Sequence, residues 1–459
     1  MTENIDVIVI GAGQAGPSIA SRFAAAGQKV ALIERALVGG TCVNTGCMPT
    51  KTLVASARVA HMARRSGDFG IKLEGGVEID MNRVSERAHT VTENARGGLE
   101  RWIQSTENIE LVRGHARFVG PHEVEVGDRV LNAPRIFVNV GGRARFPDMP
   151  GLSEVECLTN TSVLSLTRVP KHLIVVGGSY IGLEFAQMYR RFGSEVTVVE
   201  QGPVLVSRED EDVSLAIKDI LEREGISCRL NARCISFARH PEGVQVNLDC
   251  STGAPSVPGS DVLLAVGRVP NTDDLGLDKA GIVADSRGFI VVDDTLATNV
   301  EGVWAVGDCN GKGAFTHTAY NDFEIVTANI LDGEQRKVSD RIQGYALYID
   351  PPLGRAGMTE KEARKTGRPL LVSKRPMTRV GRAVERDETQ GFMKVIADAE
   401  TKQVLGAAIL GVEGDEAIHG VLDIMSARVP YPVLEWAVPI HPTVSELIPT
   451  LLRDMKPAH

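Results

Sequence analysis

The stretch DVIVIGAGQAGPSIASRFAAAGQKVALIE, residues 6–34, opens with an apolar run, turns through glycines and continues in a helical pattern. It then enters a second apolar, β-branched run that ends at Glu34. This order predicts a strand–helix–strand unit whose first turn receives the pyrophosphate of a dinucleotide. Gly11 would make the tight turn, Gly13 would let the backbone approach the phosphates, and Gly16 would allow close helix–strand packing.

The same pattern returns 166 residues later, without a gap, in HLIVVGGSYIGLEFAQMYRRFGSEVTVVE, residues 172–200. Gly177 and Gly182 take the places of the first and third glycine, while the middle place holds Ser179, which is also small. Each copy ends at an acid 23 residues after its first glycine, and the acid of the second copy is Glu200. Such a carboxylate can accept hydrogen bonds from ribose hydroxyls. One glycine motif alone is weak evidence, but two copies in register predict two dinucleotide-binding units.

Two nucleotide units in one chain indicate an electron relay between two cofactors. The first unit leads directly into a pair of cysteines, so we expect it to hold FAD. The second unit would then hold a diffusible nicotinamide dinucleotide. Glu200 would repel a 2′-phosphate and no arginine directly follows it, which favours NADH over NADPH. Arg208 lies nearby in the sequence and leaves NADPH open.

The bulk composition bounds the class of protein. A chain of 459 residues is too long for one core, so we expect two to four domains. A net charge of −9 argues against a general nucleic-acid binder. No apolar run reaches the ~18–20 residues that a membrane span needs, and the N-terminus enters a strand without a signal-peptide pattern. Seven cysteines are too sparse for a secreted disulfide scaffold, so we expect a cytoplasmic protein.

Cys42 and Cys47 lie in GGTCVNTGCMPTK, residues 39–51. A zinc site usually needs four ligands, often as two close pairs, and this pair has no second pair at matching spacing. A redox-active dithiol is therefore favoured over a metal site and over an inert structural disulfide. We expect the two thiols on one face at the beginning of a helix, close enough to bond. The helix N-terminus would stabilise a thiolate there.

The rest of the chain shows a coarser organisation. We expect alternating strands over residues 101–140 and 228–266, a domain exit at 143–151, a strand with a glycine turn at 303–308 and a separate α+β domain from about 341. The predicted fold class is α/β, with two Rossmann-like dinucleotide-binding domains and a C-terminal α+β domain.

These motifs together resemble those of the class I pyridine nucleotide–disulfide oxidoreductases, which include dihydrolipoamide dehydrogenase, glutathione reductase and mercuric reductase. The match covers nearly the whole chain through GAGQAG, GGTCVNTGCMPTK, GGSYIGLE, VGRVPN, VWAVGD and HPTVSE, in family order. The resemblance implies an FAD domain of residues 1–150 and 270–340, an NAD(P) domain of residues 151–269 and a dimerisation domain of residues 341–459. It also implies a homodimer whose active sites are shared across the interface.

The resemblance further implies roles for single residues. Cys42 would be the interchange thiol that attacks the substrate, and Cys47 would lie against the flavin as the charge-transfer thiolate. Lys51 would pair with Glu184 beside the flavin N5 and stabilise the reduced, anionic flavin. Tyr180 would cover the nicotinamide pocket and move when the dinucleotide binds.

His441 lies in IHPTVSE, five residues before Glu446, whose carboxylate can orient the imidazole. This pair resembles the acid–base of the family, which the partner subunit contributes to each site. For FAD, the resemblance implies Gly40, Thr41, Lys51, His115, Ala116, Gly141 and Asp308 besides the glycines and Glu34 of the first unit. For NAD(P), it implies Tyr180, Ile181 and Gly267 besides Gly177, Ser179, Gly182 and Glu200. No residue is assigned to a metal.

Some motifs depart from the family pattern, and these departures bear on which molecule accepts the electrons. Asn139-Val140-Gly141 stands where the family usually has Ala-Thr-Gly, so a threonine hydroxyl is missing near the flavin. PPLGRAGMTE, residues 351–360, departs from the lipoamide dehydrogenase pattern, and the C-terminal cysteines of mercuric reductases are missing. The chain looks closest to a mercuric-reductase-like subgroup that includes a bacterial enzyme linked to reactive-chlorine resistance and copper(II) reduction.

Several acceptors therefore stay open. One is a small disulfide or another small oxidant. Another is a metal ion, Hg(II) or Cu(II), or a reactive oxidant, and a third is the lipoyl group of a multienzyme complex to which the chain would dock. Tyr348, Arg355 and Trp436 are candidates for lining the acceptor pocket.

Overall fold

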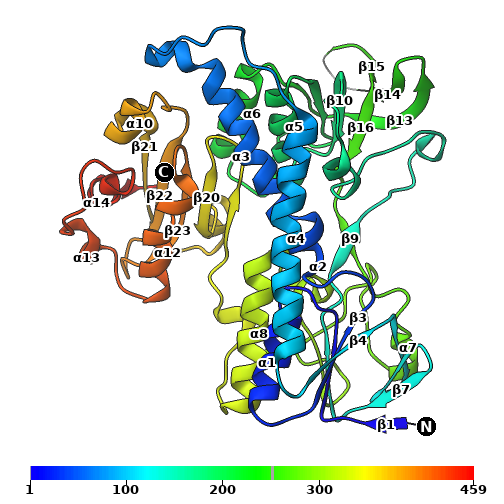
Figure 1. Ribbon diagram of the computed structural model, residues 1–459. Coiled ribbons are helices and arrows are strands. Elements are labelled where there is room, and N and C mark those ends of the chain that lie inside the picture. Colours follow the sequence, from blue (N-terminus) through cyan, green and yellow to red (C-terminus); the bar gives the residue numbers. More distant parts are fainter. Residues whose placement is uncertain (1, 250–252, 459) are drawn as a thin grey trace.

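The computed structural model describes residues 2–249 and 253–458, so Cys250 lies outside the described part. Figure 1 shows three sheet-centred regions: a lower one built from blue and yellow-green segments, an upper green one, and a C-terminal one in orange and red beside them. The mixed α/β architecture expected from the sequence is confirmed.

The lower region contains a five-stranded sheet in the order β18-β8-β2-β3-β4, with all neighbouring strands parallel. Its strands are β2 (Val7–Ile10), β3 (Val30–Glu34), β4 (Ile109–Arg113), β8 (Arg135–Val138) and β18 (Val303–Ala305). Helix α1 (Gly16–Ala25) connects β2 to β3. β2 and β3 are buried along their whole length, as expected for apolar strands covered on both faces. Because β18 joins β8, this sheet is assembled from two distant parts of the chain.

The upper region repeats this plan. Its parallel sheet has the order β12-β11-β10-β16, with β10 central like β2. The elements are β10 (His172–Val176), α5 (Tyr180–Phe192), β11 (Glu195–Val199), α6 (Glu211–Arg223), β12 (Ser227–Arg229) and β16 (Asp261–Leu264). The sequence repeat is thus a structural repeat that extends to the neighbouring strands.

The first glycine of each repeat is required by close backbone contact. Gly11 has a φ of 104°, and a Cβ there would lie 2.3 Å from the carbonyl oxygen of Asn139, directly after β8. Gly177 has a φ of 116°, and its Cβ would lie 2.3 Å from the carbonyl oxygen of Ala265, directly after β16. The same turn is therefore built twice against the same neighbouring strand end.

Two smaller sheets add to the lower and upper regions, and a strand pair joins the two regions. One has the order β1-β7-β6-β5, and another β13-β14-β15. Their strands are β1 (Thr2–Asn4), β5 (Ala116–Gly120), β6 (Glu123–Val126), β7 (Arg129–Asn132), β13 (Arg233–His240), β14 (Gly243–Asp249) and β15 (Ser256–Gly259). β9 (Gly142–Ala144) pairs antiparallel with β17 (Arg268–Pro270), so the chain leaves the lower region and returns to it on adjacent strands. The pairing agrees with an inserted domain, whose boundaries stay a prediction.

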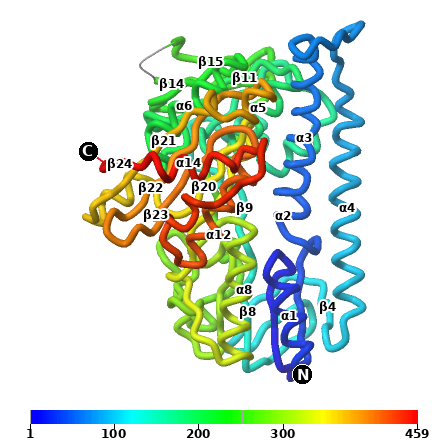
Figure 2. Tube along the Cα trace, turned by 90° about the vertical axis from the view of Figure 1, so that its left-hand side faces the viewer, coloured from blue at the N-terminus to red at the C-terminus, as the bar shows by residue number. Residues whose placement is uncertain are grey.

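Two long helices run next to each other, and the longer one spans the upper and lower regions (Figure 2). After α2 (Gly40–Thr45) come α3 (Cys47–Arg64) and α4 (Met81–Ser105), which lie side by side in Figure 2. Asp80 caps α4 by accepting a hydrogen bond from the backbone N–H of Arg83 at 3.1 Å. The alternating strands that we expected from residue 101 begin only at Ile109, because α4 continues to Ser105.

The C-terminal region is a six-stranded sheet covered by short helices, which confirms the expected α+β character. Its antiparallel strand order is β19-β20-β23-β22-β21-β24. The strands are β19 (Gly344–Leu347), β20 (Leu353–Gly357), β21 (Leu370–Pro376), β22 (Phe392–Asp398), β23 (Val404–Leu410) and β24 (Lys456–Pro457). The remaining helices are α7 (Leu277–Ala280), α8 (Thr316–Leu331), α9 (Glu360–Lys365), α10 (Gly381–Glu385), α11 (Gly414–Ala417), α12 (His419–Ser426), α13 (Pro432–Glu435) and α14 (Ile448–Arg453). Within the described residues, none of the helices is long and apolar enough to span a membrane.

Candidate active site

One cavity of about 2450 Å³ connects the two repeats with the C-terminal region. Cys42, Cys47, Lys51 and Glu184 all line it. Of the predicted cofactor residues, those that line it are Gly11, Gly13, Glu34, Gly40, Thr41, His115, Ala116, Gly141, Asp308, Gly177, Ser179, Tyr180, Ile181, Glu200 and Gly267. Gly16 and Gly182 instead pack helix against strand, since a Cβ at either would lie 2.1 Å from a backbone oxygen. The fold thus gathers residues from distant segments around one space.

The two cysteines do not share one helix, which corrects our expectation. Cys42 lies in α2, whereas Cys47 is the first residue of α3. Gly46 separates the helices with φ −137° and ψ −119°, and a Cβ there would lie 2.7 Å from the carbonyl oxygen of Thr41. The chain breaks at this glycine and restarts, so Cys47 sits where α3 offers unpaired N–H groups and the positive end of its dipole.

The electrostatics of the pair distinguish the two sulfurs. The hydrogen bond with Cys42 lowers the pKa of Cys47 to about 6, against the effect of burial. The hydroxyl of Thr316, 3.2 Å from the Cys47 sulfur, and the charge of Lys51 act in the same direction. The hydrogen bond with Cys47 and burial raise the pKa of Cys42. These opposite shifts make Cys47 the more acidic thiol of the pair, with Cys42 as its hydrogen-bond partner.

Lys51 and Glu184 form an ion pair beside the cysteines. The Lys51 Nζ lies 2.7 Å from one carboxylate oxygen of Glu184, whose side chain is only 6% exposed. The other oxygen accepts the backbone N–H of Tyr348 at 3.0 Å, and the Lys51 ammonium lies 4.6 Å from the centroid of the Tyr348 ring. The pair thus connects the helix that begins at Cys47 with the second repeat and with the C-terminal region.

The terminal acids of the two repeats are held alike. Glu34 accepts the backbone N–H groups of Ala12 and Ala36, each at 2.8 Å. Glu200 accepts those of Gly178 and Gly202, each at 2.7 Å. Each carboxylate is therefore fixed at the cavity wall, with lone pairs left for ribose hydroxyls.

The first repeat fits a flavin dinucleotide. A Cβ at Gly13 would meet only Asn139, at 3.4 Å or more, so the backbone is open toward the cavity. The Asn139 side chain donates to the carbonyl of Gly11 at 3.0 Å and supports this turn, while Val140 holds the place of the usual threonine. Burial raises the pKa of Asp308, which Arg268 opposes from 3.6 Å. An open glycine turn at a helix N-terminus suits a pyrophosphate.

Tyr180 lies at the beginning of α5, with its ring on the cavity wall. Its ring meets Phe315 and Tyr345 edge-on, with centroids 6.0 and 5.3 Å apart. Burial raises the pKa of its hydroxyl, and a hydrogen bond with the Tyr345 hydroxyl opposes this rise. Two aromatic edge contacts and the Tyr345 hydroxyl therefore hold this ring.

His441 and Glu446 lie outside the cavity of their own chain. Nδ1 of His441 lies 2.9 Å from a carboxylate oxygen of Glu446, while the imidazole is 79% exposed. The preceding segment exposes Trp436, Val438 and Ile440 by 80% or more. Exposed apolar runs of this kind mark interaction surfaces, and the catalytic role of the histidine stays a prediction.

Sequence reasoning missed several residues of this site. Thr316, which contacts the Cys47 sulfur, is 269 positions away, and no local spacing connects the two. Glu209 and Tyr345, which meet behind Tyr180, were missed for the same reason. Of the three acceptor-pocket candidates, Tyr348 and Arg355 line the cavity, whereas Trp436 is 83% exposed outside it.

Comparison with protein families gives two matches. Residues 5–322 match the family described as pyridine nucleotide-disulphide oxidoreductase. Residues 344–452 match the dimerisation domain of pyridine nucleotide-disulphide oxidoreductases. Together the two matches cover most of the chain.

Curated relatives align over nearly the full length. The probable pyridine nucleotide-disulfide oxidoreductase RclA of Escherichia coli (strain K12) is 35% identical over 98% of this chain and 99% of its own. Dihydrolipoyl dehydrogenase of Thermus scotoductus is 33% identical over 96% of this chain and 95% of its own. Mercuric reductase of Lysinibacillus sphaericus is 31% identical over 91% of this chain and 76% of its own.

Solved structures agree with these relatives. The HOCl-induced flavoprotein disulfide reductase RclA from Escherichia coli has a TM-score of 0.88 at 34% identity and covers 98% of this chain and 99% of its own. Its Cu(II) complex has a TM-score of 0.89 at 33% identity, with the same coverage.

Proposed function

The chain belongs to the pyridine nucleotide-disulphide oxidoreductases, enzymes that are FAD-dependent and use a pyridine nucleotide, and we propose that it passes electrons from NADH through FAD to the Cys42–Cys47 pair and on to a small disulfide or another small oxidant. The observation that carries the proposal is the single cavity shared by both glycine turns and both thiols. Within it, the Cys47 thiolate lies in the field of Lys51.

FAD, when bound, would accept a hydride from the nicotinamide and supply two electrons to the disulfide form of the cysteines. In the first repeat, the glycine turn would hold its pyrophosphate and Glu34 its ribose. His115 and Ala116 would lie near the adenine, and Asp308 near the ribityl chain. Lys51, held in place by Glu184, would balance negative charge beside the cofactor.

The reduced pair would act by thiol–disulfide exchange. The sulfur of Cys42 attacks one sulfur of the acceptor, forms a mixed disulfide and releases the first acceptor thiol. The Cys47 thiolate then attacks the Cys42 sulfur, closes the Cys42–Cys47 disulfide and releases the second product as a thiolate, which takes a proton from solvent. Cys42 needs a base because its pKa is raised. His441 of the partner subunit would take this proton and return it to the leaving thiolate.

NADH is the proposed reductant. The Glu200 carboxylate is fixed by two backbone N–H groups and would oppose a 2′-phosphate. Arg208 also lines the cavity, so NADPH is the competing choice. Comparison of kcat/KM for the two nucleotides tests this preference, and a clearly higher value for NADPH would refute it.

A second candidate function is reduction of a metal ion or a reactive oxidant. Its support is the relatives, one of which is described as HOCl-induced and as a Cu(II) complex. In residues 2–249 and 253–458, no group of three or more His, Cys, Asp or Glu side chains is arranged to hold a metal. A metal ion would therefore meet the dithiol as a substrate. The third candidate, a lipoamide dehydrogenase subunit, is supported by the dihydrolipoyl dehydrogenase relatives.

A panel of acceptors separates these candidates. Steady-state turnover with NADH would be measured on lipoamide, glutathione disulfide, Hg(II), Cu(II) and hypothiocyanous acid. High turnover with lipoamide alone would exclude the metal and oxidant candidates. High turnover with Cu(II), Hg(II) or hypothiocyanous acid and none with disulfides would exclude a disulfide as the acceptor.

The quaternary state follows from the second family match. The dimerisation domain at residues 344–452 supports a homodimer. We propose that the dimer works in the cytoplasm, because its few cysteines suit a reducing compartment.

A further inference from the structure

Tyr180 rests against an aromatic stack made of Tyr345, Phe315 and His317. Phe315 and Tyr345 lie nearly parallel, with centroids 5.5 Å apart and an angle of 12°. His317 stacks on Phe315 at 5.4 Å. The Tyr180 ring meets the first two members of this stack edge-on, so the stack limits how far the ring can swing in that direction.

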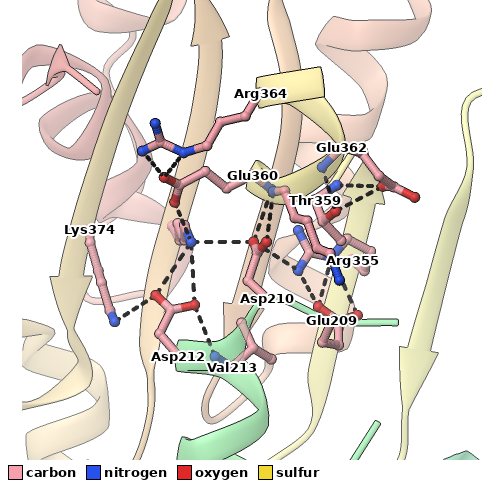
Figure 3. Close-up of polar contacts among 12 residues, drawn as sticks. Glu209, Asp210, Asp212, Val213, Arg355, Thr359, Glu360, Glu362, Arg364 and Lys374 are labelled. Carbon is pink, nitrogen blue, oxygen red and sulfur yellow. Dashed lines mark hydrogen bonds and ion pairs between the residues drawn. The ribbon is translucent and has the colours of Figure 1, made fainter. Parts of the chain in front are cut away.

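The stack is anchored at Tyr345 by a buried carboxylate. The Tyr345 hydroxyl donates to Glu209. Arg355 lies directly opposite Tyr345 in the β19–β20 pairing and donates from Nε to the same carboxylate at 3.1 Å. Glu209 is 0% and Arg355 1% exposed, so the carboxylate depends on these two partners in place of water. Figure 3 shows Arg355 reaching both Glu209 and the neighbouring Asp210.

Glu209 belongs to the loop that follows the second-repeat acid, Glu200. Arg208 precedes it and lines the cavity. Asp210 follows it and is bound by the buried Lys394 at 3.3 Å. In Figure 3 this cluster joins the loop to strands and a helix of the C-terminal region. One set of buried charges therefore fixes both the nucleotide-side loop and the stack behind Tyr180.

We propose that Glu209 and Arg355 are positioning residues, which fix Tyr345 and thereby hold Tyr180 over the nicotinamide half of the cavity in the resting enzyme. This inference rests on the proposed function, in which Tyr180 moves when the dinucleotide binds. Tyr180 lines the cavity and meets the stack edge-on, with no bond to a charged group in the described part of the chain, so it is the movable ring. Tyr345 is bonded to a buried ion pair, so it is the fixed one. The inference assigns a role to the arginine of PPLGRAGMTE.

The test uses the holoenzyme dimer and NAD⁺, which binds without transferring electrons. Tyr345→Phe keeps the ring and its stacking but removes the hydroxyl that donates to Glu209 and interacts with Tyr180, whereas Glu209→Gln leaves that hydroxyl in place. If the aromatic stack is held less firmly, the Tyr180 ring should more often leave the nicotinamide pocket uncovered. We therefore expect NAD⁺ to bind about three- to tenfold more tightly. Reoxidation of the reduced dithiol by a disulfide should stay unchanged, because that step uses the other half of the site. Glu209→Gln should shift the NAD⁺ affinity in the same direction.

Two controls separate positioning from general loosening. Arg364→Gln removes an exposed member of the same cluster that pairs with Glu360, and it should leave NAD⁺ affinity unchanged. In a Tyr180→Ala background, Tyr345→Phe should have no further effect, because it acts through the missing ring. An equal effect of Tyr345→Phe in both backgrounds would overturn the proposal.

The outcomes also distinguish failure of the positioning role from failure of the proposed movement of Tyr180. If Tyr180→Ala changes NAD⁺ affinity while Tyr345→Phe does not, the positioning role is overturned and the movable Tyr180 stands. If Tyr180→Ala leaves NAD⁺ affinity unchanged, the movement of Tyr180 is contradicted, and the positioning role falls with it.

Discussion

The Nζ of Lys51 lies 2.7 Å from a carboxylate oxygen of Glu184, joining the helix that begins at Cys47 to the first helix of the second repeat. Because Glu184 is buried and Lys51 is one-third exposed, the pair orients one charge toward the cavity while the other stays inside. The ion pair holds the Lys51 ammonium in a fixed position, from which its charge lowers the pKa of Cys47.

Loss of this lysine should affect both stability and the thiol. Lys51→Met leaves the Glu184 carboxylate buried without its ion partner, which should lower the free energy of unfolding by about 1–3 kcal/mol after allowance for solvent screening. It should also raise the pKa of Cys47, since the Lys51 charge is one of the causes that lower it. Denaturant unfolding and a thiol titration measure the two effects. Lys51→Arg keeps the charge and is the control; equal shifts in both variants would contradict the electrostatic explanation.

The thiolate of the reduced enzyme should titrate near pH 6. A lowered pKa means that Cys47 stays charged above about 6 and takes a proton as the pH falls through that value. The long-wavelength thiolate-to-flavin absorbance of the two-electron-reduced holoenzyme should therefore be present at pH 8 and be lost below about pH 6. Thr316→Val removes one hydrogen bond to the sulfur and should move the midpoint upward. A midpoint that stays near 9 would contradict the assigned thiolate.

The second glycine turn should be sensitive to one methyl group. Gly177→Ala places a Cβ 2.3 Å from the carbonyl oxygen of Ala265 and should weaken NAD⁺ binding at least tenfold. Gly193→Ala has a similar φ of 118° but nothing within 4 Å of its Cβ, so it isolates the backbone cost of about 1–2 kcal/mol. Equilibrium titration with NAD⁺ compares the two variants. Similar NAD⁺ affinities would show that the contact at Ala265 does not shape the nucleotide turn.

The exposed imidazole should act across the dimer. His441→Gln should reduce disulfide turnover by 10²-fold or more, consistent with loss of an acid–base, while leaving thermal stability unchanged. Random mixing of His441→Gln with Cys42→Ser subunits should restore about a quarter of wild-type activity, because half of the dimers carry one complete site. Without recovered activity on mixing, the histidine would not serve the partner subunit.

The repeat explains why much of the fold could be predicted. A Cβ at Gly11 or at Gly177 would lie 2.3 Å from a backbone oxygen of the neighbouring strand end, so the same close packing requires glycine in both motifs. The helix break at Gly46 could not be predicted from the spacing of the cysteines, because the same spacing is compatible with one continuous helix and with two helices separated by a glycine. The strand onset near residue 101 was missed because α4 runs on to Ser105 before the alternating pattern begins.

Site residues that depend on contacts between distant segments could not be predicted from the sequence. Thr316 reaches the Cys47 sulfur, and Glu209 meets Tyr345 and Arg355, only after separate regions pack together. Each of these residue types is ordinary in its own segment, and their meeting depends on the tertiary fold. The resemblance supplied roles for the motif residues but was silent on these three contacts.

The central claim is that electrons reach the acceptor through Cys42, and the Cys42→Ser holoenzyme tests it most directly. The variant keeps the nucleotide units and Cys47, so NADH should still reduce its flavin in a rapid-mixing experiment. Steady-state reduction of a disulfide acceptor should be abolished, because no interchange thiol remains to form the mixed disulfide. Disulfide turnover at the wild-type rate in Cys42→Ser would contradict this account.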